Sequence, residues 1–262
     1  MAKISDLFRQ IIESYKLAFI FIGLALPFAL VPVFGEALQH FVEFKLGMFA
    51  LEKGDDFSHK KQAIRISFGA IKVVSILFIS LVLPRFFLKN YTRKNPLSFT
   101  KQHTSALLKG LVAVLLMMLW VFLIGPVIVS FLMPSLSKLK ATLLLLLSPF
   151  LLGFIFTKPV NNWIAGLWSL PRPATDQHKA INNAIFGIGF IVQIAAIFPA
   201  MALHYWLGFN AMGATGTTLA IILILDSLVV GLLACLMASC VFVLFRDTYG
   251  PVHRNNFKST LS

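Results

Sequence analysis

Six long apolar runs constrain the fold of this chain more than any other feature, because each reaches or exceeds the ~17 residues needed to cross a bilayer core. The runs are residues 17–34, 66–84, 107–132, 141–157, 184–208 and 218–245. A backbone surrounded by lipid must satisfy its own hydrogen bonds, so such runs form helices. We therefore predict an all-α, polytopic integral membrane protein with one six-helix transmembrane domain over residues 17–245.

The composition excludes a soluble domain. Hydrophobic residues make up 58% of the chain and charged residues only 13%, about half of the roughly 25% that soluble proteins carry. The net charge of +13 would suggest nucleic acid as the partner of a soluble protein. Here the basic residues lie in short connections between apolar runs, so we expect membrane lipids with anionic headgroups as partners, and no nucleic acid.

The segments outside the apolar runs predict two further helices and a tail. In residues 1–16, apolar side chains recur at helical spacing opposite a charged face, which indicates an amphipathic helix on the membrane surface. Residues 36–52 are expected to form a second interfacial helix, on the outer side. Residues 246–262 are expected to form a polar cytoplasmic tail.

Basic residues in the short connections set the expected orientation. The segment 85–109 contains six basic residues and no acidic residue, so the positive-inside rule places it in the cytoplasm, together with both termini. Four of its residues are expected to contact anionic headgroups: Arg85, Lys89, Arg93 and Lys94. The loops are short and no disulfide is expected. Both features are typical of a bacterial inner-membrane protein.

Lys72 and Asp226 are the two fully ionisable groups inside the predicted spans. Counted from the outer ends of their spans, they lie about 9 Å and 12 Å deep. A lone charge near the middle of a span costs roughly 2.5–3.5 kcal/mol on insertion scales, so the two residues are predicted to form a buried ion pair. The pair could be static, or it could open and close with protonation as in a proton-coupled carrier.

A stripe of polar residues follows the first apolar run. Glu36, His40 and Glu43, with Gln39 between them, share one face of a helix. Glutamate and histidine at this spacing can ligate a divalent metal or act as acid and base. The alternative is simpler, because an interfacial helix also requires one wet face.

The fifth span carries two further intramembrane polar residues, Gln193 and His204, on either side of Pro199. Proline frees a backbone carbonyl that a nearby polar side chain can satisfy. Gln193 could instead bond to another helix. These residues indicate a kinked helix and do not identify a substrate.

Three function classes remain open. Walker, GxSxG, HExxH and CxxC motifs are absent, no family signature was recognised, and no cofactor is expected. The scarcity of buried polar groups favours a non-catalytic accessory or assembly component that binds lipid, a partner membrane protein or a second copy of itself. The alternative is a small proton-linked carrier of an amphiphilic substrate using Asp226 and Lys72. A metal-dependent enzyme using Glu36, His40 and Glu43 is the third class.

Overall fold

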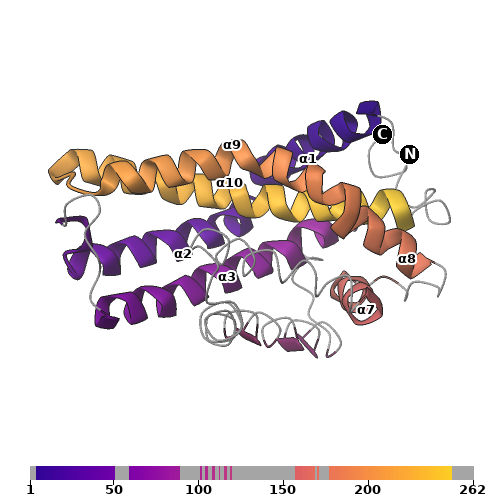
Figure 1. Cartoon of the computed structure of the whole chain (residues 1–262), viewed down its shortest axis with the longest axis horizontal. Coiled ribbons are helices and arrows are strands. Elements are labelled where there is room, and N and C mark those ends of the chain that lie inside the picture. The colour runs from indigo at the N-terminus through magenta and orange to yellow at the C-terminus, as the bar shows by residue number, and fades with distance from the viewer. Residues whose placement is uncertain are drawn as a thin grey trace, which may run out of the picture.

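The computed structural model describes residues 4–50, 59–88, 157–168 and 177–249, together with Leu170 and scattered positions between 101 and 119. Within these residues every regular element is helical and no strand occurs (Figure 1). The elements in chain order are α1 (Ile4–Leu24), α2 (Leu26–Lys45), the 3-10 turn η1 (Met48–Ala50), α3 (His59–Leu88), α7 (Thr157–Leu167), α8 (Gln177–Asn182), the π-helical turn η3 (Asn183–Gly187), α9 (Ile188–Ala211) and α10 (Gly216–Tyr249). The all-helical prediction is confirmed for the described residues.

Three stretches of helix are long and apolar enough to cross a membrane: Ala63–Leu88, His178–Ala211 and Gly216–Thr248. They contain the predicted spans 66–84, 184–208 and 218–245. The helices α1 and α2 pass the same test together, which raises the number of candidate spans to four. The predicted spans 107–132 and 141–157 lie almost entirely outside the described residues, so the six-span arrangement stays a prediction.

The first predicted span is not one straight helix. The axes of α1 and α2 differ by 98°, and the break lies at Ala25, with Pro27 in the first turn of α2. Proline has no N–H to give to the preceding turn but suits the start of a helix, where that N–H has no partner. The sequence therefore begins a new helix at the point where we predicted the middle of a span, residues 17–34.

The predicted outer interfacial helix over residues 36–52 also requires correction. Its first ten residues are the second half of α2, which packs in the bundle against α3 and α10. The helix ends at Lys45, and Gly47 follows with a φ of 67°, a left-handed conformation that glycine adopts without steric cost.

The helix α1 presents an apolar stripe on its outer side. Ile4, Phe8 and Ile12, spaced four residues apart, are exposed, while Leu17 and Phe21 are buried in the core. An exposed apolar stripe on an amphipathic helix suits contact with lipid.

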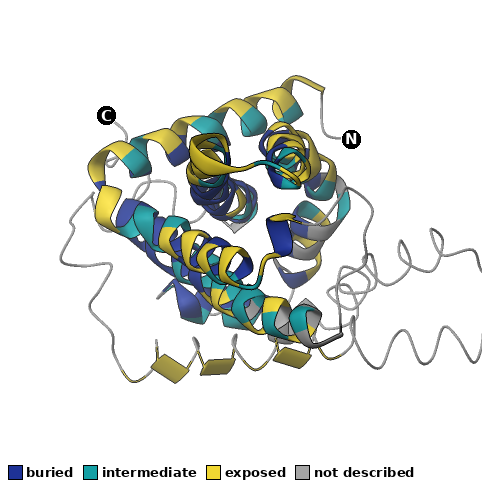
Figure 2. Ribbon diagram, turned by 90° about the vertical axis from the view of Figure 1, so that its left-hand side faces the viewer, coloured by how far each residue is buried: buried dark blue, intermediate teal, exposed yellow. Residues whose placement is uncertain are grey.

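The long helices α2, α3, α9 and α10 run side by side (Figure 1). Seen along the bundle, their buried residues face inward and their exposed residues face outward (Figure 2). A glycine allows α10 to approach α2 closely, since a Cβ atom at Gly231 would lie 2.5 Å from Cγ2 of Val33.

Different contacts hold the two ends of the bundle. At the end where α2 finishes and α10 begins (left in Figure 1), the Gly213 N–H donates to the Phe49 carbonyl over 2.8 Å. At the other end, Arg9 lies 2.9 Å from Asp247. The beginning of α1 and the end of α10 therefore meet at the same end of the bundle, while the cytoplasmic location of that end stays a prediction.

Candidate functional site

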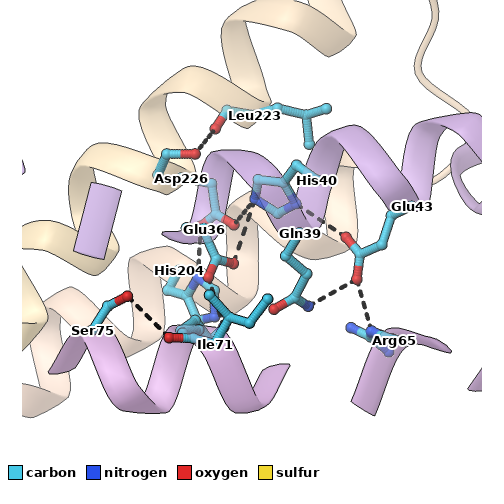
Figure 3. Close-up of polar contacts among 12 residues, drawn as sticks. Glu36, Gln39, His40, Glu43, Arg65, Ile71, Ser75, His204, Leu223 and Asp226 are labelled. Atoms are coloured by element: carbon cyan, nitrogen blue, oxygen red, sulfur yellow. Dashed lines mark hydrogen bonds and ion pairs between the residues drawn. The ribbon is translucent and has the colours of Figure 1, made fainter. Parts of the chain in front are cut away.

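Eight polar side chains from four helices meet near one end of the bundle, and we call them the polar cluster. Figure 3 labels all of them except Lys72. They are Glu36, Gln39, His40 and Glu43 of α2, Arg65 and Lys72 of α3, His204 of α9 and Asp226 of α10.

The polar stripe of α2 faces the interior. Glu36, Gln39, His40 and Glu43 are only 1%, 6%, 7% and 5% exposed. The simpler interpretation of the stripe, a wet face on an interfacial helix, is therefore corrected, because this face of α2 is covered by α3 and α10. Buried carboxylates and imidazoles require partners, and each of the four side chains contacts another member of the cluster.

His40 is placed between two carboxylates. Its Nδ1 lies 3.0 Å from Oε2 of Glu43, and its Nε2 lies 2.9 Å from Oδ2 of Asp226. A neutral imidazole has only one N–H. Both contacts are hydrogen bonds only when the ring, or one of the two carboxyl groups, carries an additional proton.

Asp226 is 1% exposed and is held from two directions. His40 of α2 contacts Oδ2, and Nδ1 of His204 in α9 lies 2.7 Å from Oδ1. The sequence identified His204 as an intramembrane polar residue, and the structure gives it a specific partner. One carboxylate thereby links three helices.

Lys72 has a different partner from the one we expected. Its Nζ lies 2.9 Å from Oε2 of Glu36, whereas the direct contacts of Asp226 are with histidines. The predicted direct pair of Lys72 with Asp226 is replaced because α2 presents Glu36 to α3 and His40 to α10. The two charges belong to one network, in which Oε1 of Glu36 is 3.5 Å from Nε2 of His40.

Glu43 contacts three side chains at the edge of the cluster. The Arg65 Nε–H and the Gln39 amide both donate to its Oε1 over 2.9 Å, and His40 contacts its Oε2. Arg65 was not predicted from the sequence to be a site residue. The available signal was its spacing, since Arg65 precedes Lys72 by two helical turns and so lies on the same face of α3.

A cavity of about 680 Å³ adjoins the cluster. All eight cluster residues line it, together with Met48, Phe49, Tyr205, Trp206, Gly208, Phe209 and Met212 near the end of the bundle. Asp226 lies about 15 Å along α10 from its first residue at 1.5 Å per residue. The cavity therefore brings charged groups well inside an otherwise apolar bundle.

The positive and negative formal charges of the cluster nearly cancel. Three carboxylates face one lysine and one arginine, and the two imidazoles can each be neutral or charged. With both imidazoles neutral the formal sum is −1, and with one protonated it is zero. The arrangement can therefore retain a proton, or accept a cation in its place.

A second groove, of about 480 Å³, lies between α2 and α10. Its lining is apolar apart from His40 and Ser227, and several lining residues, such as Phe34 and Ile224, are exposed on the outside of the bundle. His40 lines both this groove and the polar cavity.

The remaining predicted site residues lie elsewhere. Gln193 donates to the Ile185 carbonyl over 2.8 Å, so it satisfies the backbone at the π-helical turn η3 instead of bridging to a distant helix. Arg85, expected at lipid headgroups, is 0% exposed because the last two turns of α3 are enclosed. Lys89, Arg93 and Lys94 lie outside the described residues.

Comparisons with protein-family models, with curated proteins and with solved structures found no match.

Proposed function

We propose that this protein is a small membrane carrier that holds a charged or polar solute in the cavity beside the polar cluster. The observation that supports the proposal is the convergence of eight polar side chains from four helices on a cavity of about 680 Å³. A cavity lined in this way offers a solute the polar environment that the apolar bundle otherwise lacks.

The cluster changes the balance between the function classes. The accessory role followed from a scarcity of buried polar groups, yet Glu36, Glu43 and Asp226 are all buried carboxylates in the described helices. The alternative from the sequence, a carrier, named Asp226 and Lys72, and both line the cavity. The carrier is therefore the hypothesis that this geometry supports best.

The two ends of α10 suit a carrier that opens one end at a time. Asp226 and Arg246 are twenty residues apart, or about 30 Å along the helix. At the far end, Arg246 lies 2.7 Å from Glu13 of α1, and Arg9 lies 2.9 Å from Asp247. An apolar core lies between the two charged groups. A solute bound at the cluster shifts the equilibrium between a conformation open at one end and a conformation open at the other only if it binds one of the two more tightly.

The test measures how readily a water-soluble reagent reaches each end of the bundle, and it does not require the solute to be known. Cys235 and Cys240 are buried and not bonded to each other, so they are first replaced by alanine to remove the background. Single cysteines are then introduced by Met212→Cys at the cavity and by Thr248→Cys at the other end. Their reaction with a membrane-impermeant maleimide is followed in the full-length protein in proteoliposomes.

The carrier hypothesis predicts opposite changes in the labelling rates at the two ends. Conditions or candidate solutes that slow labelling at position 212 should speed labelling at position 248, and Asp226→Asn should abolish this correlation. If both rates stay constant across solutes and in the Asp226→Asn variant, the cluster is a static part of the bundle. The accessory role would then be the better explanation.

A further inference from the structure

We propose that Glu36, His204 and Asp226 form a binding site for a first-row divalent metal ion. Each residue offers one ligand atom, and these atoms lie within 4.8 Å of one another. The residues come from α2, α9 and α10, so a bound ion would join three helices. The proposal deepens the carrier function by naming the class of its solute, and it depends on that function only for transport.

The three ligand atoms are near enough to one another for one ion to draw them together. Zinc binds imidazole nitrogen and carboxylate oxygen at about 2.0–2.2 Å in a tetrahedral arrangement, so two ligand atoms of one ion are about 3.4 Å apart. Ligand atoms at the observed limit of 4.8 Å must therefore approach each other by about 1.4 Å when the ion binds. Two carboxylates and one imidazole suit zinc, manganese or iron(II), whereas a soft ion such as copper(I) prefers sulfur ligands.

The neighbouring residues orient these ligands. Oδ2 of Asp226 contacts His40, and His40 contacts Glu43, which also accepts hydrogen bonds from Gln39 and Arg65. Hydrogen bonds of this kind to ligating carboxylates fix their direction at metal sites. Glu36 has an ionic contact instead, with Lys72 Nζ 2.9 Å from its Oε2, and its Oε1 has a longer 3.5 Å contact with His40.

A second observation also indicates that this cavity binds a ligand. Gln39 lines the same cavity and is 6% exposed, yet its Oε1 accepts no hydrogen bond from the described residues. Figure 3 shows the amide nitrogen directed at Glu43 and the amide oxygen directed away from it. Buried carbonyl oxygens are nearly always satisfied, and a water on a bound ion, or the ion itself, would satisfy this one.

Lys72 makes the site suitable for an ion that is released again. Its ammonium group lies 2.9 Å from Glu36, close enough to oppose the charge of a bound cation. The site should therefore bind more weakly than the same ligands without the lysine. This property suits a transported ion better than a permanently bound one.

The test titrates the purified full-length protein in detergent with Mn²⁺, followed by electron paramagnetic resonance, and with Zn²⁺, followed by calorimetry. One ion per chain should bind. Asp226→Asn and Glu36→Gln should each weaken binding by more than about 10-fold, because each removes a ligand and loss of even a group that supports a ligand typically costs about 10–100-fold. Lys72→Met should strengthen binding by several-fold.

Two controls exclude trivial explanations. Glu13→Gln removes a carboxylate at the far end of the bundle and should leave affinity unchanged, and replacement of Cys235 and Cys240 by alanine should do the same. Each variant must elute as the wild-type protein does in size-exclusion chromatography. If Asp226→Asn is not folded, His204→Asn provides the same test from α9.

The results separate this inference from the carrier proposal. No saturable binding up to millimolar metal, or binding that Asp226→Asn and His204→Asn leave intact, overturns the site. Metal binding without opposite changes in labelling at the two ends supports the site and overturns the carrier. Opposite labelling changes in a protein that binds no metal support the carrier and overturn the assignment of its solute.

Discussion

His40 Nε2 lies 2.9 Å from Oδ2 of Asp226, so a buried polar contact joins α2 to α10. Nδ1 of the same ring lies 3.0 Å from Glu43. The ring thus couples two carboxylates that have no direct contact, and His204 extends the network to α9.

Replacement of His40 by phenylalanine should strongly destabilise the protein. The substitution keeps a ring of similar size but removes both nitrogen atoms, so the buried carboxylates of Glu43 and Asp226 each lose a partner. Each buried group left unsatisfied costs about 1–3 kcal/mol, and more when it is charged. The midpoint of thermal unfolding in detergent should fall, whereas Phe41→Leu, at the exposed neighbouring position, should change it little.

The Lys72–Glu36 contact should be detectable as an energetic coupling. In a double-mutant cycle, Lys72→Met and Glu36→Gln should be strongly non-additive, with an interaction energy of about 0.5–3 kcal/mol, the range for residues in contact. The cycle of Lys72→Met with Asp226→Asn should give a smaller coupling, because Glu36 and His40 lie between the two charges. Equal couplings in the two cycles would contradict this order of contacts.

The sequence predicted the chemistry of the cluster better than its connections. Depth along the predicted spans identified Lys72 and Asp226 as buried charges, and helical spacing identified Glu36, His40 and Glu43 as one face. Neither signal specifies which helices are neighbours. The pairing of Lys72 was therefore assigned to the other intramembrane charge, although a nearer carboxylate lies on α2.

The location of α2 explains most of the difference between prediction and structure. The span predicted over residues 17–34 placed the polar stripe just outside the membrane, where exposure is its simplest explanation. The break at Ala25 shifts the second helix along the chain, so that residues 36–45 enter the bundle. Apolar composition alone cannot show this shift, because α1 and α2 are both apolar; Pro27 was the local signal that a helix begins there.

Close packing of α10 against α2 should be sensitive to one methyl group. A Cβ atom at position 231 would lie 2.5 Å from Cγ2 of Val33 and 3.5 Å from the Ala29 carbonyl oxygen. Gly231→Ala should therefore destabilise the protein by about 1–3 kcal/mol, as overpacking does, although alanine favours helix. Gly23→Ala is the matched control, since a Cβ atom there meets no atom within 4 Å, and it should be neutral or slightly stabilising.

The ionic contacts at the far end of α10 should control how firmly α1 is attached. Arg246 is largely buried and lies 2.7 Å from Glu13, while its second terminal nitrogen lies 2.9 Å from Asp247. Arg246→Met should free both carboxylates and allow α1 to separate, because this pair and the Arg9–Asp247 contact join the two helices at this end. The measurement is hydrogen–deuterium exchange over Ile4–Leu24, which should become faster.

A nearby substitution distinguishes this effect from a general loss of charge. Asp6 contacts Arg9 at 4.0 Å, and about half of each side chain is exposed. Exposed pairs on one helix contribute little, about 0.3–0.5 kcal/mol, so Asp6→Asn should leave exchange in α1 almost unchanged. If Arg246→Met and Asp6→Asn had equal effects, the attachment of α1 would depend on its apolar contacts with the core, such as those of Leu17 and Phe21, and not on Arg246.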